Sequence, residues 1–387
     1  MKKGKMILII LAVVLIITGG AMMAGAYLSL ENNASSQLAA MEFVEKTHTV
    51  TDDFTMIRIS TINSSIELLP SPDGVCRIVC DDNEKMYHKI SVDEFETGAQ
   101  LNIDQHDDWE WYEMLYGLYR EEDLLLRIYL PKAEYALMHL DSSSGDITIA
   151  PDFKFDTLAT LTGSGNASLI DLSVKNLTIQ SSSGDIMLRN VEAESDVSAE
   201  TISGFTRIEN LQATNVTVAS SSGDMNLELI ASNYLRATSS SGNIMVFESS
   251  FHDTSYFENI SGSIEIVDSD CGDQTVQVIS GSVTLQNVTG GSLNVSTSSG
   301  DISLWDTLCS GNVLCHTVSG EIVFTGTDAK NLELITSSGD VSGNLLSGKI
   351  FMTETSSGYV SVPPSNESAG TCHIQTVSGN INIAIEP

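Results

Sequence analysis

A Ser-Gly dipeptide recurs along residues 145–379 at a nearly constant spacing, and this repeat limits the possible folds more than any other feature. Successive glycines lie 19 to 21 residues apart. A steady period of this length is typical of repeat architectures, in which each unit buries its apolar face only against its neighbours. The glycines of the thirteen copies are Gly145, Gly165, Gly184, Gly204, Gly223, Gly242, Gly262, Gly281, Gly300, Gly320, Gly339, Gly358 and Gly379.

Apolar residues flank each glycine with a period of two. They stand seven and five residues before it, as in Leu177 and Ile179, and two and four residues after it, as in Ile186 and Leu188. This alternation indicates a strand with one buried face, so each repeat is expected to hold two short strands. The buried set shifts by one residue at Ser-Gly. A corner or bulge would explain the shift, and glycine suits a positive φ there.

Stacking of these repeats predicts an all-β fold, a parallel right-handed β-solenoid (β-helix) of about 13 coils with a 19–20-residue period. At the spacing of paired strands the rod would be about 62 Å long. Ser or Thr usually stands three residues before the glycine, as in Ser181 and Thr201. We expect these hydroxyls to hydrogen-bond along the column. An antiparallel sandwich is the alternative fold, but it predicts more varied turns.

Residues 51–140 lack the regular Ser-Gly repeat and are expected to form an N-terminal β segment that caps the solenoid. Phe54 to Leu69 resembles a degenerate coil with Asn63-Ser64-Ser65 in place of Ser-Ser-Gly. Further strands are predicted at Val75 to Cys80, Leu101 to Asp104 and Leu124 to Leu130.

The cap region also contains the aromatic segment QHDDWEWYEMLYGLYREED. The spacing of its aromatic residues favours a short amphipathic helix placed over the first coil. The same residues are the best candidate for a partner-binding patch, and packing against the first coil is the competing interpretation. The residues of this predicted site are Trp109, Trp111, Tyr112, Tyr116 and Tyr119.

The N-terminus predicts a membrane anchor. Three lysines among the first five residues precede an uncharged stretch from Met6 to Leu30. As a helix this stretch would reach roughly 37 Å, enough to cross a bilayer core. The lysines place the first residues in the cytoplasm and the bulk of the chain outside it. Cleavage at Ala24-Gly25-Ala26, with secretion, is the alternative.

These features divide the chain into five parts. We expect residues 1–5 to be a cytoplasmic tail, 6–28 a transmembrane signal anchor, 29–50 a linker, 51–140 the cap and 141–387 the solenoid repeats. The chain carries 51 acidic and 18 basic side chains, a formal net charge of −33. Nucleic acid is therefore excluded as a partner, because phosphate binding needs clustered Lys and Arg.

The anchor, the IYLP stretch at Ile128 to Pro131 and the SSSGDI pattern at Ser142 to Ile147 and Ser181 to Ile186 resemble the bacterial putative-adhesin family of β-strand-repeat proteins. The resemblance covers about residues 40–387. It implies a surface-exposed envelope protein containing a domain of unknown function, and it carries over no catalytic residue.

Catalytic and metal-binding patterns are weak in this sequence. No catalytic residue, metal site or cofactor is predicted, because the basic residues after Asp141 form no cluster and the histidines show no ligand spacing. An acidic column that includes Asp301, Glu321 and Asp340 could attract calcium, but a solvated face is the simpler interpretation. The six cysteines are expected to be free thiols, buried for the most part, because none is placed to form a disulfide bond.

Three classes of function are compatible with these observations. The first is a non-enzymatic envelope protein whose rod binds a cell-surface glycan or protein. The second is an accessory or sensor component of an envelope-stress system, and the third is a polysaccharide-active β-helix enzyme. Ile381, Ile383 and Ile385 are expected in the last coil, whose open edge would be covered by loops or by another chain.

Overall fold

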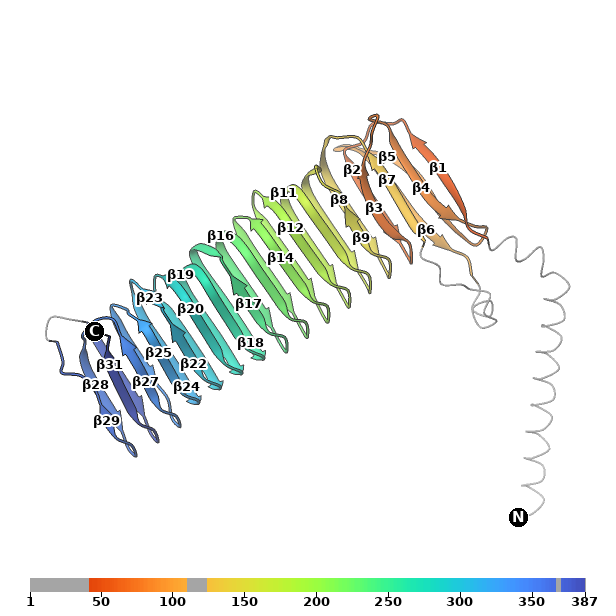
Figure 1. Ribbon diagram of the computed structural model, residues 1–387. Helices are drawn as coiled ribbons and strands as arrows, with labels where there is room; N and C mark the ends of the chain where they lie inside the picture. Colours follow the sequence, from red (N-terminus) through yellow and green to blue (C-terminus); the bar gives the residue numbers. More distant parts are fainter. Residues whose placement is uncertain (1–41, 110–123, 367–369, 387) are drawn as a thin grey trace, which may run out of the picture.

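The computed structural model describes residues 42–109, 124–366 and 370–386. These residues form a rod in which successive coils of β-strands stack around one continuous apolar core (Figure 1). Each coil is called a turn of the solenoid below. The all-β solenoid predicted from the repeat is therefore confirmed. The anchor predicted at residues 6–28 lies outside the described residues. Within those ranges, no helix combines the length and the apolar character that crossing a membrane requires.

One long side of the rod, called here the leading side, holds the residues that precede each glycine. Its neighbouring strands pair in parallel with each other. From the N-terminal end it stacks β6 (Gly98–Asp107), β2 (Met56–Thr61), β8 (Glu134–Ser142), β10 (Lys154–Thr162), the end of β11 (Ala167–Ser181), β13 (Asp196–Thr201), β15 (Asn215–Ser220), the end of β16 (Met225–Ser239), β18 (Ser250–Ser261), the end of β19 (Ile264–Ser280), β21 (Leu293–Ser299), β24 (Asn312–Ser319), β26 (Asn331–Ile335), β30 (Thr371–Thr376) and β28 (Ile350–Thr355).

The second long side, the trailing side, holds the residues that follow each glycine. It stacks β7 (Leu125–Leu130), β3 (Ser65–Pro70), β9 (Ile147–Ile149), the start of β11, β12 (Ile186–Ala193), β14 (Thr206–Gln212), the start of β16, β17 (Ile244–Phe247), the start of β19, β20 (Val283–Gly290), β22 (Ile302–Trp305), β25 (Ile322–Thr327), β27 (Val341–Leu345), β31 (Ile381–Ile385) and β29 (Val360–Ser361).

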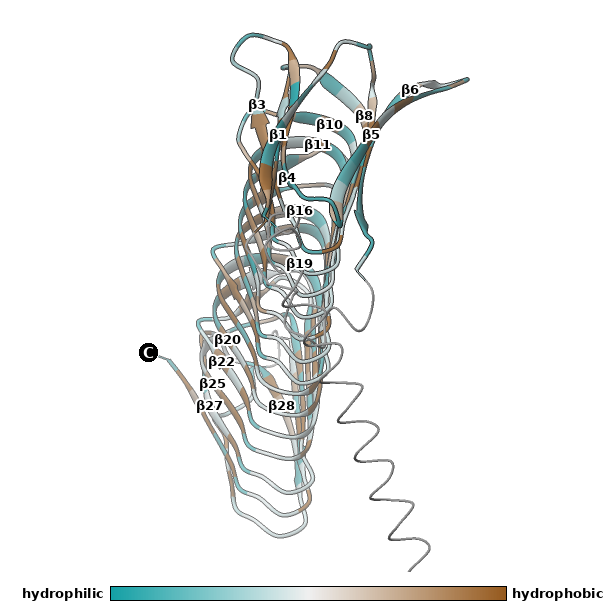
Figure 2. Cartoon of the chain, turned by 90° about the vertical axis from the view of Figure 1, so that its right-hand side faces the viewer, coloured by the Kyte–Doolittle hydropathy of each residue, from teal (hydrophilic) through white to brown (hydrophobic). Residues whose placement is uncertain are grey.

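A short third side joins the trailing side to the next turn, and the period-two pattern did not predict it. It consists of the last residues of strands such as β12 and β20, and of β23 (Leu308–Cys309). Two inward columns, seven and nine residues after the glycine, fill the core from this side, as Leu172 and Val174 do. Seen from its end, the rod shows successive turns following one another around a shared core (Figure 2).

The Ser-Gly corner shifts the buried set by one residue, as predicted, but for a different reason. In one repeat Ser181 is buried before the corner, and Gly184 and Ile186 are buried after it. Positive φ is not the common requirement. A Cβ on each glycine of the column would overlap the carbonyl group of the residue stacked next to it, as for Gly184 on Gly165. Glycine is therefore needed because the backbones of adjacent turns approach so closely.

The hydroxyl column bonds to the glycine backbone. In some turns the backbone N–H of the glycine donates to the hydroxyl three residues earlier, as Gly223 does to Ser220 Oγ at 2.8 Å. In others the hydroxyl donates to the glycine carbonyl of the preceding turn, as Thr336 Oγ1 does to Gly320 at 3.0 Å. The expectation that hydroxyls bond to one another along the column is thus replaced by hydroxyl-to-glycine bonds that hold the corner.

At both ends of the rod, the turns stack in a different order from their order in the sequence. At the C-terminal end, β30 pairs with β26 on one side and with β28 on the other, and β31 likewise lies between β27 and β29. The turn of Ile381, Ile383 and Ile385 is therefore next to last, and the expectation that it ends the stack is wrong. The turn formed by β28 and β29 is the outermost.

The N-terminal end has the same kind of insertion. The turn of β2 and β3 lies between β6 and β7 on one side and β8 and β9 on the other. The degenerate coil is present, but Ser64 occupies the glycine position beneath Gly145, and Ile66 pairs with Ile147. The sequence comparison, which set Asn63-Ser64-Ser65 in place of Ser-Ser-Gly, put this position one residue too late, at Ser65.

Antiparallel strands complete the cap. β4 (Cys76–Asp82) pairs with β7, β5 (Met86–Phe95) pairs with β6, and β1 (Val44–Val50) pairs with β4. Strand β1 lies within residues assigned from sequence to a linker. The far end of the β5–β6 hairpin projects from the stack (Figure 2).

Candidate functional site: grooves along the rod

The aromatic patch predicted from sequence is represented in the structure by one residue. Trp111, Tyr112, Tyr116 and Tyr119 lie outside the described residues. Trp109 is half-buried, and its backbone N–H donates to Asp107 Oδ1 at 2.9 Å. The patch, and its alternative as a cover for the first coil, therefore stay predictions.

The acidic column one residue after the glycine has a structural role. Asp301 Oδ1 accepts the backbone N–H of Glu321 at 2.8 Å, one turn further along. Asp340 Oδ1 likewise accepts the N–H of Asn380 at 2.7 Å. These carboxylate oxygens tie consecutive turns together and act as hydrogen-bond acceptors at the surface.

A second polar column, six residues after the glycine, was missed in the sequence. Asp171, Asn190 and Asn210 stand there with φ between 53° and 57°. Asn190 Nδ2 donates to Asp171 Oδ1 at 2.7 Å, and Asn210 Nδ2 donates to Asn190 Oδ1 at 2.8 Å. At this corner the backbone is in the left-handed conformation, which explains the residue type, because Asn and Asp tolerate that conformation best after glycine. The recurring Asx residue was the available signal.

A groove of about 710 Å³ runs along the leading side toward the C-terminal end. It crosses the turns of β19, β21, β24, β26, β30 and β28, and its lining is mostly amide, hydroxyl and aliphatic. We call it the distal groove; it is lined by Asp273, Gln274, Thr275, Ser292, Leu293, Asn294, Asn312, Val313, Leu314, Asn331, Leu332, Glu333, Met352, Thr371 and His373.

Hydrogen bonds between turns preorganise one wall of the distal groove. Asn331 Nδ2 donates to Asn312 Oδ1 at 2.9 Å, and Asn331 Oδ1 accepts the Thr371 backbone N–H at 3.0 Å. His373 Nδ1 lies 3.8 Å from Glu333 Oε1, and both side chains are exposed. Because the polar groups repeat at the strand spacing, about 4.8 Å, they can contact successive units of an extended ligand.

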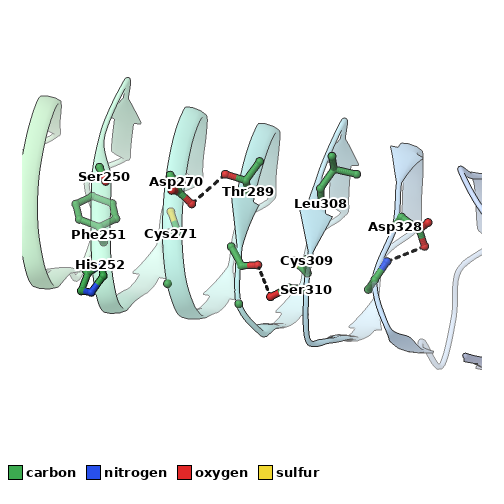
Figure 3. A pocket seen from close by; sticks show the side chains of 14 residues that line it. Ser250, Phe251, His252, Asp270, Cys271, Thr289, Leu308, Cys309, Ser310 and Asp328 are labelled. Carbon is green, nitrogen blue, oxygen red and sulfur yellow. Dashed lines mark hydrogen bonds between the residues drawn. The ribbon is translucent and has the colours of Figure 1, made fainter.

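The short side carries a second groove, of about 610 Å³, shown in Figure 3. Thr289 Oγ1 donates to Asp270 Oδ1 at 2.9 Å, which bridges two turns. Two cysteines line it. Burial raises the pKa of Cys271 to about 12 and that of Cys309 to about 11. Both thiols are therefore protonated near neutral pH, which makes them poor nucleophiles.

The buried ammonium group of Lys349 lies at the C-terminal end of the short side. Lys349 is 5% exposed, and its Nζ lies 2.7 Å from Asp328 Oδ1 and donates to the Ala329 carbonyl at 2.6 Å. Partial burial would raise the pKa of Asp328, but the hydrogen bond and charge of Lys349 outweigh it and hold that pKa below its usual value. The pair satisfies polar groups where the sequential stack ends.

Residues Arg236, Tyr256, Glu258 and Gln277 form a polar aromatic cluster midway along the leading side. The Arg236 guanidinium lies 4.4 Å from the centre of the Tyr256 ring and 3.2 Å from Glu258 Oε2. Tyr256 Oη is within 3.1 Å of both Glu258 Oε2 and Gln277 Oε1. The Arg236 guanidinium is thus already paired with Glu258 and Tyr256 within the cluster.

The stacked turns, the Ser-Gly corner and the grooves along a continuous rod define a parallel β-solenoid protein. The model of the Toastrack DUF4097 family matches residues 54–267 and 249–387. The chain belongs to this family, a domain of unknown function with β-repeat architecture, which confirms the resemblance drawn from the sequence. A comparison with curated proteins gave no match.

Several solved structures are similar to the chain, and three of them are compared with it below. A "putative cell adhesion protein" from Clostridium sporogenes is 10% identical, with a TM-score of 0.20, over 89% of this chain and 100% of that one. A "putative adhesin" from Parabacteroides merdae is 11% identical, with a TM-score of 0.25, over 78% and 96%. A "putative adhesin" from Bacteroides fragilis is 11% identical, with a TM-score of 0.23, over 89% and 97%.

Proposed function

We propose that this protein is a non-enzymatic envelope protein that stands outside the cytoplasmic membrane and binds an uncharged surface glycan along its rod. The distal groove carries the proposal. Its amides and hydroxyls repeat from turn to turn, and the half-buried Leu314 and the exposed Met352 add apolar surface, which together suit the two kinds of surface on a sugar chain. The net charge of −33 disfavours a polyanionic ligand.

The position of the groove supports a binding role. It crosses the turns nearest the C-terminal end, whereas β1, which follows the predicted anchor, lies at the opposite end (Figure 1). With residues 6–28 in the membrane, the distal groove would lie on the part of the rod most accessible to surface material. The lysines before the apolar stretch support this orientation.

The chemistry of the groove supports a non-enzymatic role. Most of its polar groups are amides and hydroxyls, which do not ionise near neutral pH and so recognise a glycan better than they catalyse its cleavage. Of its ionisable groups, Asp273 Oδ1 accepts the Ser292 backbone N–H at 2.8 Å, and Glu333 lies beside His373. Elsewhere on the rod, carboxylates such as Asp301 and Asp340 accept backbone hydrogen bonds, and Arg236 is paired with Glu258.

Co-sedimentation of the detergent-solubilised full-length chain with cell envelopes and neutral cell-wall glycans tests this function. We expect the unmodified chain to sediment with the glycan, and the double variant Asn294→Glu, Leu314→Glu to stay in solution because it places carboxylates in the groove. The matched control is Thr217→Glu. It changes the same column of the leading side outside the groove and is expected to bind normally.

Three results would contradict the proposal. Binding lost only in Trp109→Ala would move the site to the aromatic segment of the cap. Release of sugars from the glycan would show an enzyme. No binding of the unmodified chain to any surface would favour the accessory or sensor role.

A further inference from the structure

The N-terminal cap brings together three side chains of the types that bind transition metals. His48 comes from β1, and Cys80 and Asp82 come from β4, the strand with which β1 pairs antiparallel. One ligand atom from each of the three residues lies within 4.8 Å of the other two. Cys80 and Asp82 are 0% and 3% exposed, so the donors converge in a protected site.

The hydrogen bonding around these donors is incomplete. Nε2 of His48 is buried and has no hydrogen-bond partner within the ranges that the structure describes. The Cys80 thiol makes a long contact of 3.9 Å with the Lys46 carbonyl and a hydrogen bond with the Asp82 carboxylate. Buried polar groups are normally hydrogen-bonded, and leaving one without a partner has a free-energy cost. A bound ion would supply the missing partner of His48 and would take the place of the Cys80 thiol proton.

Asp82 is already oriented by a second histidine. His88 Nδ1 lies 2.7 Å from Asp82 Oδ1, and the His88 backbone N–H donates to the same oxygen at 3.0 Å. The other oxygen, Oδ2, faces Lys46, whose Nζ is 3.4 Å away. Since the Lys46 side chain is 48% exposed, it can turn into solvent and leave Oδ2 to an ion. A histidine that fixes a ligating carboxylate is a common support of metal sites.

We propose that His48, Cys80 and Asp82 bind a divalent transition-metal ion of the zinc class. Imidazole nitrogen, thiolate and carboxylate are all zinc ligands, and three protein ligands leave a fourth position for water. Calcium and magnesium prefer oxygen-only sites and do not fit this donor set.

The ion would fasten strand β1 to the rod. Within the described residues β1 pairs only with β4, and most of its side chains are exposed. A ligand from each strand makes the ion a cross-link between them. Because β1 follows the predicted membrane anchor, this cross-link would set how firmly the rod is joined to its N-terminal segment.

Cobalt(II) titration of the full-length, reduced, chelator-treated protein tests the site. A tetrahedral thiolate site gives Co²⁺ a sulfur-to-metal charge-transfer band and strong visible absorption. We expect both signals to saturate at one ion per chain and to disappear on addition of Zn²⁺. They should be lost in Cys80→Ser and reduced at least tenfold in apparent affinity in His48→Gln.

Cys76→Ser is the matched control, because Cys76 is buried on the same strand outside the ligand group. It should retain both signals, and circular dichroism should show the same β content for all variants. The site is refuted if the unmodified chain gives no charge-transfer band. It is equally refuted if the band survives in folded Cys80→Ser or is lost in folded Cys76→Ser.

Discussion

Individual residues of the left-handed corner show how a side chain is selected by backbone conformation. Asp171, Asn190 and Asn210 adopt this conformation and also form side-chain hydrogen bonds between turns. Leu229 occupies the next turn of the column with φ of 56°, although a leucine has no side-chain group to compensate for the strain and is 42% exposed. The left-handed region costs most L-residues about 1–2 kcal/mol.

Leu229→Asn is therefore expected to stabilise the protein by about 1 kcal/mol, by relieving this strain and extending the ladder. Urea unfolding followed by circular dichroism would measure the change. Leu229→Ala is the control, because alanine keeps a Cβ and gains no hydrogen bond. Equal stability of the two variants would show that backbone strain at this position is unimportant.

At the scale of the elements, the Ser-Gly corner determines how closely the turns stack. Gly223 has no room for a Cβ, which would overlap the carbonyl oxygen of Gly204 and come within 3.2 Å of Ser220 Oγ. The corner combines this close approach with a hydrogen bond from the Gly223 N–H to Ser220. The repeat thus encodes a packing distance as well as a turn.

Gly223→Ala should destabilise the protein by about 3 kcal/mol or more, because the clash is with backbone atoms that cannot move without separating the turns. Gly348→Ala serves as the comparison, since its Cβ would meet only the Asn366 side chain, at 3.3 Å. We expect that variant to lose less than about 1 kcal/mol. Similar losses in denaturant midpoint for the two variants would contradict the close-approach explanation.

Across the whole molecule, both ends are closed by turns inserted out of sequence order. At the C-terminal end, β30 and β31 separate β28 and β29 from the rest of the stack. The outermost turn has few direct contacts with earlier turns and depends on the last segment of the chain. The stability of this end is therefore non-local, unlike that of a stack in which each turn contacts its neighbours in sequence.

Deletion of residues 370–387 should release the outermost turn and make residues 346–366 sensitive to protease, while β27 and the preceding turns stay protected. Limited proteolysis with mass spectrometry would locate the cleavage sites. Truncation after Leu345 is the control for simple loss of the end. Protection of β28 in the deletion variant would mean that this turn docks directly on β26, against the expectation.

Three sequence patterns were sufficient to predict a parallel solenoid: the 19–20-residue repeat, the period-two alternation of apolar residues and the recurring glycine. A repeat of this length that cannot bury its own apolar face must stack on its neighbours. The same local patterns identified residues 54–69 as a degenerate coil, although its glycine position is Ser64 and not Ser65. The short third side was not predicted, because its two inward columns vary from Leu172 and Val174 to Ser and Gly in other repeats.

Only the tertiary structure decided the order of the terminal turns, because near-identical repeats carry no local signal for which neighbour they pair with. It also decided the two groups of greatest functional interest. The distal groove joins residues of six turns, and the cap joins His48 to Cys80 and Asp82 across more than thirty residues of sequence. Such groups depend on strand pairing, so their spacing along the chain has no characteristic pattern.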